Sequence, residues 1–133
     1  MIKKENLTVK LLEACPSFKV AYDALDADEK SLDYIVAGYF AQHLLNLYKA
    51  KELNEFPAVV ELIEQLHVNG DKYVQEYATI GLLEGIQNSW GDNETELKKF
   101  TELLLPVSLK WWKSLNKFWS SEIPHVGADI KDS

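Results

Sequence analysis

The stretch GDKYVQEYATIGLLEGIQNSW, residues 70–90, decides the fold class of this chain. It opens on a turn signal and then repeats apolar residues at the spacing of a helix. On a wheel of about 100° per residue, one side of this helix carries Val74, Tyr77, Ala78, Gly81, Leu82 and Gly85. Because a glycine inside a helix costs about 1 kcal/mol relative to alanine, we expect a neighbouring helix to approach closely at Gly81 and Gly85.

The opposite side of this helix becomes apolar toward its C-terminal end, where Leu83, Ile86 and Trp90 interrupt a polar surface. That end needs a second cover, because a surface helix normally has a single apolar stripe. Two sources of the cover are open: a tryptophan-rich helix near the end of this chain, or a partner protein.

Upstream of this stretch, polar clusters divide the chain into further helices, and no segment alternates as a strand does. A short helix containing Leu7 is expected first. Residues 18–25 form an ambiguous segment, and DADEKS, residues 26–31, is predicted to be a polar break. A helix from about residue 30 to about residue 53, capped by Ser31 or a nearby aspartate, should follow. Its single broad apolar face comprises Leu32, Ile35, Val36, Tyr39, Phe40, Leu44 and Leu47.

A helical hairpin is predicted for residues 57–90. Pro57 suits the first turn of a helix, and the apolar residues after it recur at i, i+3, i+4 and i+7. Asn69 and Gly70 are expected to take the left-handed conformation that ends many helices, and Asp71 to cap the next helix. Since the turn is so short, the two helices should be antiparallel.

The C-terminal part is predicted to hold a short helix and then a last helix, PVSLKWWKSLNKFWSS, residues 106–121. One face of the last helix carries Trp111, Trp112, Leu115, Phe118 and Trp119, and the other carries three lysines. Most of the aromatic face is expected to be core, with one tryptophan edge left as a candidate interface anchor. Residues 1–120 are therefore predicted to form a single domain, and residues 121–133 a flexible tail.

Length and composition limit the class of protein. At 133 residues, with 47% hydrophobic and 26% charged residues, the chain suits one soluble globular domain. Its formal net charge of −7 disfavours binding to nucleic acid and suits a basic protein partner. No apolar run reaches the ~20 residues of a membrane helix, and the first residues lack a signal-peptide pattern. Because Cys15 is the only cysteine and no intrachain disulfide can form, we expect a cytoplasmic protein.

A family resemblance is carried by FPAVVELIEQLHVNGDKYVQEYATIGLLEGI, residues 56–86. It has a proline at the start of one helix, a Gly-Asp turn, and a second helix opening YVQEYA with small residues beyond. This stretch resembles a HEAT-type repeat. The resemblance implies an all-α fold, a compact right-handed array of about six helices around a central HEAT-like hairpin.

The whole chain also resembles small bacterial helical proteins of the toxin-immunity type, on YFAQHLLNLYKAKELNEFPAVVELIEQLHVNGD and LLPVSLKWWKSLNKFW. This resemblance implies a noncatalytic interaction module, most concretely an immunity protein that binds and neutralises a basic toxin domain. The residues expected to bind the partner are Leu83, Trp90, Glu76, Asp71, Trp112 and Trp119. We expect a monomer, or a weak homodimer joined through apolar surface around Trp90.

A small enzyme or regulator is the alternative, with a polar site around His43, Glu64, His67 and Glu84. Glu64 and His67 have the Glu-x-x-His spacing of di-iron bundles, which require a second such motif from another helix. The sequence has no second copy, so neither a metal nor another cofactor is expected. His43 lies within an apolar face, where a hydrogen-bonded core residue is the simpler interpretation.

Overall fold

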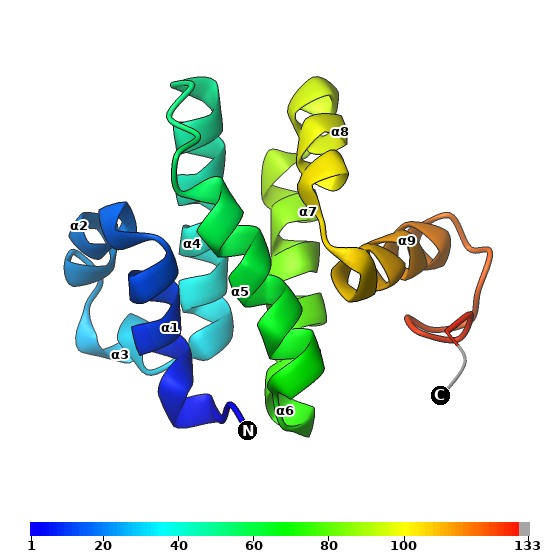
Figure 1. Cartoon of the computed structure of the whole chain (residues 1–133), viewed down its shortest axis with the longest axis horizontal. Coiled ribbons are helices and arrows are strands. Elements are labelled where there is room, and N and C mark those ends of the chain that lie inside the picture. The colour runs from blue at the N-terminus through cyan, green and yellow to red at the C-terminus, as the bar shows by residue number, and fades with distance from the viewer. Residues whose placement is uncertain (131–133) are drawn as a thin grey trace.

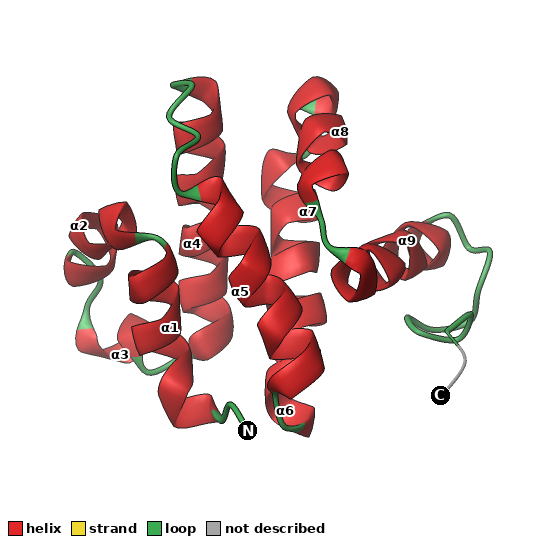
Figure 2. Cartoon of the chain, viewed as in Figure 1, coloured by secondary structure: helices red, strands yellow, loops and turns green. Residues whose placement is uncertain are grey.

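The computed structural model describes residues 1–130, and helices are the regular secondary structure in that range, apart from one isolated β-bridge between Ile2 and Gly70 (Figure 2). This confirms the all-α fold class. Short 3-10 turns, η1 and η2, cover Lys4–Asn6 and Pro16–Phe18. The longer elements are α1 (Leu7–Ala14), α2 (Lys19–Asp23), α3 (Ala27–Lys30), α4 (Asp33–Lys49), α5 (Phe56–Asn69), α6 (Lys72–Glu76), the π-helical η3 (Tyr77–Leu83), α7 (Glu84–Trp90), α8 (Glu94–Leu103) and α9 (Pro106–Trp119).

The polar segment before α4 forms a helical turn where a break was predicted. Asp26 accepts a hydrogen bond from the Glu29 backbone N–H (2.8 Å), and the Glu29 carboxylate accepts one from the Asp26 N–H (3.2 Å). This capping box stabilises α3. With residues 72–90 counted as one helix, residues 1–130 hold eight helices, where about six were expected. The helix predicted from about residue 30 begins only after Leu32, whose side chain makes no capping bond, so the predicted Ser31 or aspartate cap is wrong.

The turn between α5 and α6 differs from its prediction at two residues. Asp71 accepts a hydrogen bond from the Val74 N–H (2.9 Å) and caps α6, as predicted. Gly70, however, is extended, with φ −82° and ψ 154°, and Asn69 is the last residue of α5, so neither residue is left-handed. A Cβ at Gly70 would lie 2.4 Å from the Val74 side chain, so the close approach of the two helices requires glycine here.

The N-terminus pairs with this extended turn. The Ile2 N–H donates to the Asn69 carbonyl oxygen (2.8 Å), and the Ile2 carbonyl accepts from the Asp71 N–H (3.0 Å). The contact with Ile2 therefore satisfies the Asn69 carbonyl and the Asp71 N–H, whereas a left-handed cap would satisfy such groups within the turn itself.

Residues 72–90 form one continuous helical rod of α6, η3 and α7. In η3 the backbone bonds run from i to i+5, so the angular register of a regular α-helix is lost beyond it. A Cβ at Gly81 would lie 3.1 Å from the ring of Tyr77, so the nearest group at this glycine is a side chain of the same rod and not another helix. At Gly85 the neighbouring helix is α4, but a Cβ would lie 3.8 Å from Ala41, an ordinary contact, so the approach is not close enough to require glycine.

Other helices of the chain cover both apolar sides of this rod. Helix α4 packs against η3 and α7, α5 against α6 and η3, α9 against η3, and α8 against α7. Buried residues come from both sides of the predicted wheel and include Val74, Tyr77, Ala78, Leu82, Leu83, Ile86 and Trp90. A helix with two apolar sides needs more than one neighbouring helix to cover it.

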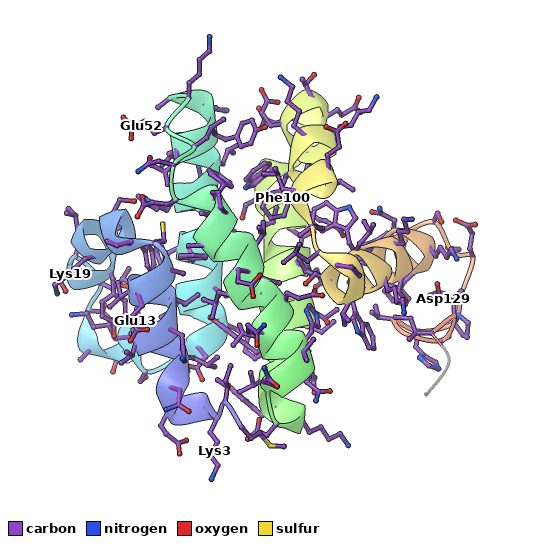
Figure 3. All side chains as sticks on the ribbon, in the orientation of Figure 1. Lys3, Glu13, Lys19, Glu52, Phe100 and Asp129 are labelled. Carbon is purple, nitrogen blue, oxygen red and sulfur yellow. The ribbon has the colours of Figure 1, made fainter. Side chains whose placement is uncertain are left out.

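Aromatic rings close the core at the C-terminal end of the rod. The centroid of the Trp90 ring lies 5.6 Å from that of Tyr48 and 5.2 Å from that of Phe100. The Trp90 Nε1–H donates to the Ala41 carbonyl oxygen (3.0 Å). Phe100, which points inward from α8 in Figure 3, also lies 5.7 Å from Trp112 of α9. Helices α4, α8 and α9 together are the second cover that the sequence required.

The helices spread along one long axis, with α2 and α3 at one end and α9 at the other (Figure 1). Residues 121–130 turn back onto α9. The Gly127 N–H donates to Ser114 Oγ (2.7 Å), and Asp129 accepts from the Ser114 hydroxyl (2.6 Å) and pairs with Lys117 (3.2 Å). Asp129 lies beside α9 in Figure 3, so this part of the predicted flexible tail is held in place; residues 131–133 lie outside the described residues.

Candidate functional site

An open groove with an apolar floor lies between α3, α4 and the end of α7. Its volume is about 570 Å³. The large apolar side chains in it are between 41% and 54% exposed, and they are Leu32, Tyr34, Ile35 and Tyr39. Apolar side chains that cluster on an open surface indicate an interaction site, whereas isolated ones do not.

Three carboxylates, those of Asp26, Asp28 and Glu29, border the same groove. Its lining in the described part of the chain includes neither lysine nor arginine. The Tyr39 hydroxyl donates to the Glu29 carboxylate (2.7 Å), and this bond raises the pKa of Tyr39. We call this surface the acid-rimmed groove, and it combines the apolar centre and polar rim of a protein interface.

The ends of α3 and α4 position the groove residues. Leu32 lies in the corner between the two helices, and Ile35 and Tyr39 follow it at i+3 and i+7, along one face of α4. A Cβ at Gly38 would meet no atom within 4 Å, so the surface between these side chains stays open.

Three residues predicted to bind a partner are buried. Leu83 and Trp90 have no exposed surface, and Trp112 is 4% exposed. The sequence left open whether this chain or another protein covers Leu83 and Trp90, and the structure shows that this chain does. Their side chains are therefore core, and neither a partner nor a second copy can reach Trp90 in this fold.

The other three predicted residues lie at or near the surface. Asp71 is half-buried and caps α6, whereas Trp119 is 57% exposed at the end of α9. Glu76 is exposed on α6. Burial first, and then the charges of Glu76 and Asp33, raise the pKa of Tyr34, so Glu76 lies near a tyrosine of the acid-rimmed groove. A partner contact at Asp71, Glu76 or Trp119 stays a prediction.

Glu64 has a structural task, which is to cap α9 from the neighbouring helix α5. Its carboxylate accepts from the Val107 N–H (3.1 Å), the Ser108 N–H (2.8 Å) and the Ser108 hydroxyl (2.8 Å). Leu105, the residue before α9, supplies no side-chain cap of its own. Burial alone would raise the pKa of Glu64, but these hydrogen bonds outweigh burial and lower it.

His67 lies beside Glu64 and is hydrogen-bonded through both ring nitrogens. Nδ1 lies 3.0 Å from the Ile63 carbonyl oxygen and 3.1 Å from Ser108 Oγ, and Nε2 lies 2.9 Å from Thr79 Oγ1. Burial lowers the pKa of His67 to about 4. The imidazole is therefore neutral near pH 7 and too weakly basic for efficient general-base catalysis there. Its arrangement suits a buried, satisfied polar network.

The other two residues of the predicted polar site lie elsewhere. His43 Nε2 lies 2.8 Å from Ser17 Oγ, whose hydroxyl donates to Glu55 (2.5 Å), and burial lowers the pKa of His43. Glu84 is half-buried in α7, and burial raises the pKa of its carboxyl. Among residues 1–130, no hydrogen bond joins His43 or Glu84 to His67. The structure thus brings together only half of the predicted site.

Metal binding, thiol reactivity and membrane crossing have no support among the described residues. Within residues 1–130, no group of three or more His, Cys, Asp or Glu side chains could hold a metal ion. Cys15 is buried, and burial raises the pKa of its thiol, which favours the unreactive protonated form. None of the helices in this range combines the length and apolarity needed to cross a membrane.

Family membership follows from a match along most of the chain. Residues 8–120 match the family described as "Domain of unknown function (DUF7674)". The chain belongs to this family. The DUF7674 match runs from α1 to the end of α9 and stops before the returning tail. No curated protein and no solved structure matches the chain.

The groove of this DUF7674 member shows where prediction from the sequence falls short. Leu32, Ile35 and Tyr39 are predicted to share one broad apolar face with Val36 and Phe40, and of these five the structure buries only the last two. The apolar residues of α4 span about half of the helix circumference, which is wider than the stripe one neighbouring helix covers. That excess width is the signal in the sequence that could have found the groove.

Proposed function

We propose that this DUF7674 member is a noncatalytic protein–protein interaction module. Its most concrete form is a cytoplasmic immunity protein that binds and neutralises a basic toxin domain. The acid-rimmed groove is the single observation that carries the proposal. Its apolar floor offers contact area, and its carboxylates favour a partner surface of opposite charge.

Charge complementarity selects the partner. The formal net charge of −7 and the carboxylates of Asp26, Asp28 and Glu29 attract a basic domain over distances of about 10 Å. An apolar side chain of that domain would fill the floor between Ile35 and Tyr39. Blocking a toxin in this way requires occupancy alone, so the chain needs no chemistry of its own.

The tyrosines of the groove are already held in place. Tyr39 is fixed by its hydrogen bond to Glu29, and the ring of Tyr34 contacts that of Tyr77 edge-on, with centroids 5.6 Å apart. Tyrosine is enriched among residues that dominate binding energy. Rings that are fixed before binding lose less conformational entropy when a partner docks.

Two further observations support a binding module over the alternative of a small enzyme or regulator. The carboxylate of Glu64 is occupied with capping α9, and His67 is neutral and hydrogen-bonded at both nitrogens. The hairpin of α5 with the rod of residues 72–90 also suits the right-handed, HEAT-like array that we propose for the fold.

The proposal predicts that a toxin gene lies beside the gene for this chain, and it is tested by producing the encoded toxin domain together with the chain in a bacterial host. Wild type and the control Val9→Asp, an exposed residue of α1, should restore growth. Ile35→Asp should weaken binding about tenfold or more and remove protection. Asp28→Lys should mainly slow association, and more so at low salt than at moderate salt.

Two results would count against the proposal. Full protection by Ile35→Asp would show that the acid-rimmed groove is not the binding surface. Failure of any protein to bind at moderate salt, together with a small molecule that copurifies, would favour the regulator instead.

A further inference from the structure

A second cavity, which shares no lining residue with the acid-rimmed groove, lies between α5, the first half of the rod, α9 and the returning tail. It has a volume of about 350 Å³, within the range of small-molecule sites. Its less exposed lining residues are His67, Thr79, Ile80, Trp111 and Val126. Four separate segments of the chain therefore contribute to its walls.

The walls of this cavity are flat and mostly apolar. The rings of His67 and Trp111 are nearly parallel, with an interplanar angle of 5° and centroids 6.4 Å apart. Ile80 and Val126 add aliphatic surface. Parallel rings beside aliphatic side chains suit a planar, apolar ligand that can pack against an aromatic face.

The hydrogen-bond chemistry of the buried wall can be assigned from its partners. The Ile63 carbonyl can only accept, so its neighbour Nδ1 of His67 carries the proton (3.0 Å). In the neutral ring Nε2 is then an acceptor, and the Thr79 hydroxyl must donate to it (2.9 Å). Thr79 Oγ1 keeps lone pairs that can accept a further hydrogen bond. The buried wall thus offers one fixed acceptor to a ligand.

The rim carries no excess of either charge. Lys72, Gln75 and Glu76 are all exposed, and they supply one cation, one amide and one anion. This mixture neither attracts nor repels a charged ligand strongly, so the interior selects for a neutral molecule.

The returning tail builds one wall. Val126 lines the cavity, and Gly127 lies so close to Trp111 that a Cβ there would be 2.8 Å from its ring. The bond from the Gly127 N–H to Ser114 holds this wall on α9. Because residues 121–130 lie beyond the DUF7674 match, this wall is a feature of the chain outside the shared domain.

We propose that this cavity binds a small, neutral, planar aromatic molecule that donates one hydrogen bond to Thr79 Oγ1. The bound molecule would lie against Trp111 and Ile80, under the wall formed by Val126. This site is separate from the protein-binding groove, so the two proposals can fail independently.

Indole and benzofuran are the matched probes, because they share a shape and differ in the one N–H donor. Saturation-transfer NMR with the full chain should show indole binding with a dissociation constant of about 1 mM or tighter, the range of a good ligand of this size. Benzofuran should bind about fivefold to tenfold more weakly, since it leaves the Thr79 acceptor unpaired.

Variants locate the site. Val126→Trp should fill the cavity from the tail, where the fold depends little on the residue, and abolish indole binding. Val20→Trp, at an 81% exposed position on α2, is the matched control and should bind indole as wild type does. Thr79→Ser keeps the hydroxyl and should keep the preference for indole over benzofuran, whereas Thr79→Val should lose it.

Three results would overturn the proposal. They are no binding of indole to wild type at concentrations several times the expected dissociation constant of about 1 mM, equal affinity for indole and benzofuran, or unchanged indole binding in Val126→Trp. If Thr79→Val fails to fold, the probe pair on wild type and the Val126→Trp variant still decide the question. None of these outcomes depends on whether a protein occupies the acid-rimmed groove.

Discussion

Two apolar surfaces of this chain exceed what one neighbouring helix covers, and they differ completely in exposure. One is the side of the rod that carries Leu83 and Trp90, which has no exposed surface at either residue. The other is the side of α4 that carries Ile35 and Tyr39, which are 43% and 44% exposed. Both have the composition of a core.

The difference comes from position in the fold. The rod has α4, α5, α8 and α9 around it, whereas the side of α4 that forms the groove lies beside the short α3 and the end of α7. The apolar character of a helix side therefore does not separate core from interface. The number of neighbouring helices does, and only the tertiary structure supplies it.

The largest loss of stability is expected at Trp90, on the covered side of the rod. Trp90→Ala should lower the free energy of unfolding by about 3–5 kcal/mol, because it leaves a large cavity among Tyr48 and Phe100 and removes the bond to Ala41. Urea unfolding followed by circular dichroism measures the loss. Trp119→Ala, at a 57% exposed position, is the control and should change stability by less than about 1 kcal/mol. Similar losses for both would mean that Trp90 is not core.

The buried network around His67 makes the free energy of unfolding depend on pH. Since burial lowers the pKa of His67 from 6.5 to about 4, the unfolded state binds more protons between these values. Stability should therefore fall as the pH drops from about 6.5 toward about 4. Between about pH 7 and about pH 5, this residue should account for about 2 kcal/mol.

Urea unfolding of wild type and His67→Gln at both pH values isolates this effect. The variant should lose less stability on acidification than wild type does. Glu64 also titrates, at lower pH, because its pKa is lowered, and it is present in both proteins. Parallel pH profiles would show that His67 is not buried in its neutral form.

The packing of α9 on α5 depends on Glu64, a residue of α5 whose carboxylate caps α9. Glu64→Gln should lower stability by about 1–2 kcal/mol, because an amide accepts fewer and weaker hydrogen bonds at the start of α9 than a carboxylate does. Thermal unfolding measures this loss. Glu61→Gln, at an exposed position on the same helix, is the control and should have little effect.

Gly85 tests how closely the rod and α4 approach. Gly85→Ala should raise stability by about 0.5–1 kcal/mol, since a Cβ would make ordinary contacts, 3.8 Å from Ala41, and alanine favours the helix. Chemical unfolding decides the sign. A destabilised variant would show that the two helices are closer than described.

The smallest effect is expected on the uncovered side. Ile35→Ala should change stability by no more than about 0.5 kcal/mol, because this side chain is 43% exposed, while it should weaken partner binding. The adjacent Val36→Ala, on the buried side, should cost about 2 kcal/mol. Equal losses in urea unfolding would show that both sides of α4 are packed.

Part of the polar network around Glu64 and His67 could not be predicted from the sequence, for a related reason. Glu64 and His67 were found from their spacing on one helix, because a local pattern brings residues at i and i+3 together. Their partners Thr79 and Ser108 come from other elements, and no local rule connects them. The capping box at Asp26 and Glu29, by contrast, is a local pattern within a segment predicted to be a break.

The sequence by itself determined that the chain is all helical, that Asp71 starts a helix, and that residues 72–90 form one rod beside α5. These features depend on residues within a few positions of one another. Only the tertiary structure decided that Gly70 is extended, that Leu83 and Trp90 are covered by α4, α8 and α9, and that Ile35 and Tyr39 remain open. Burial depends on which distant helices lie nearby, and the spacing of residues within one helix carries no information on that.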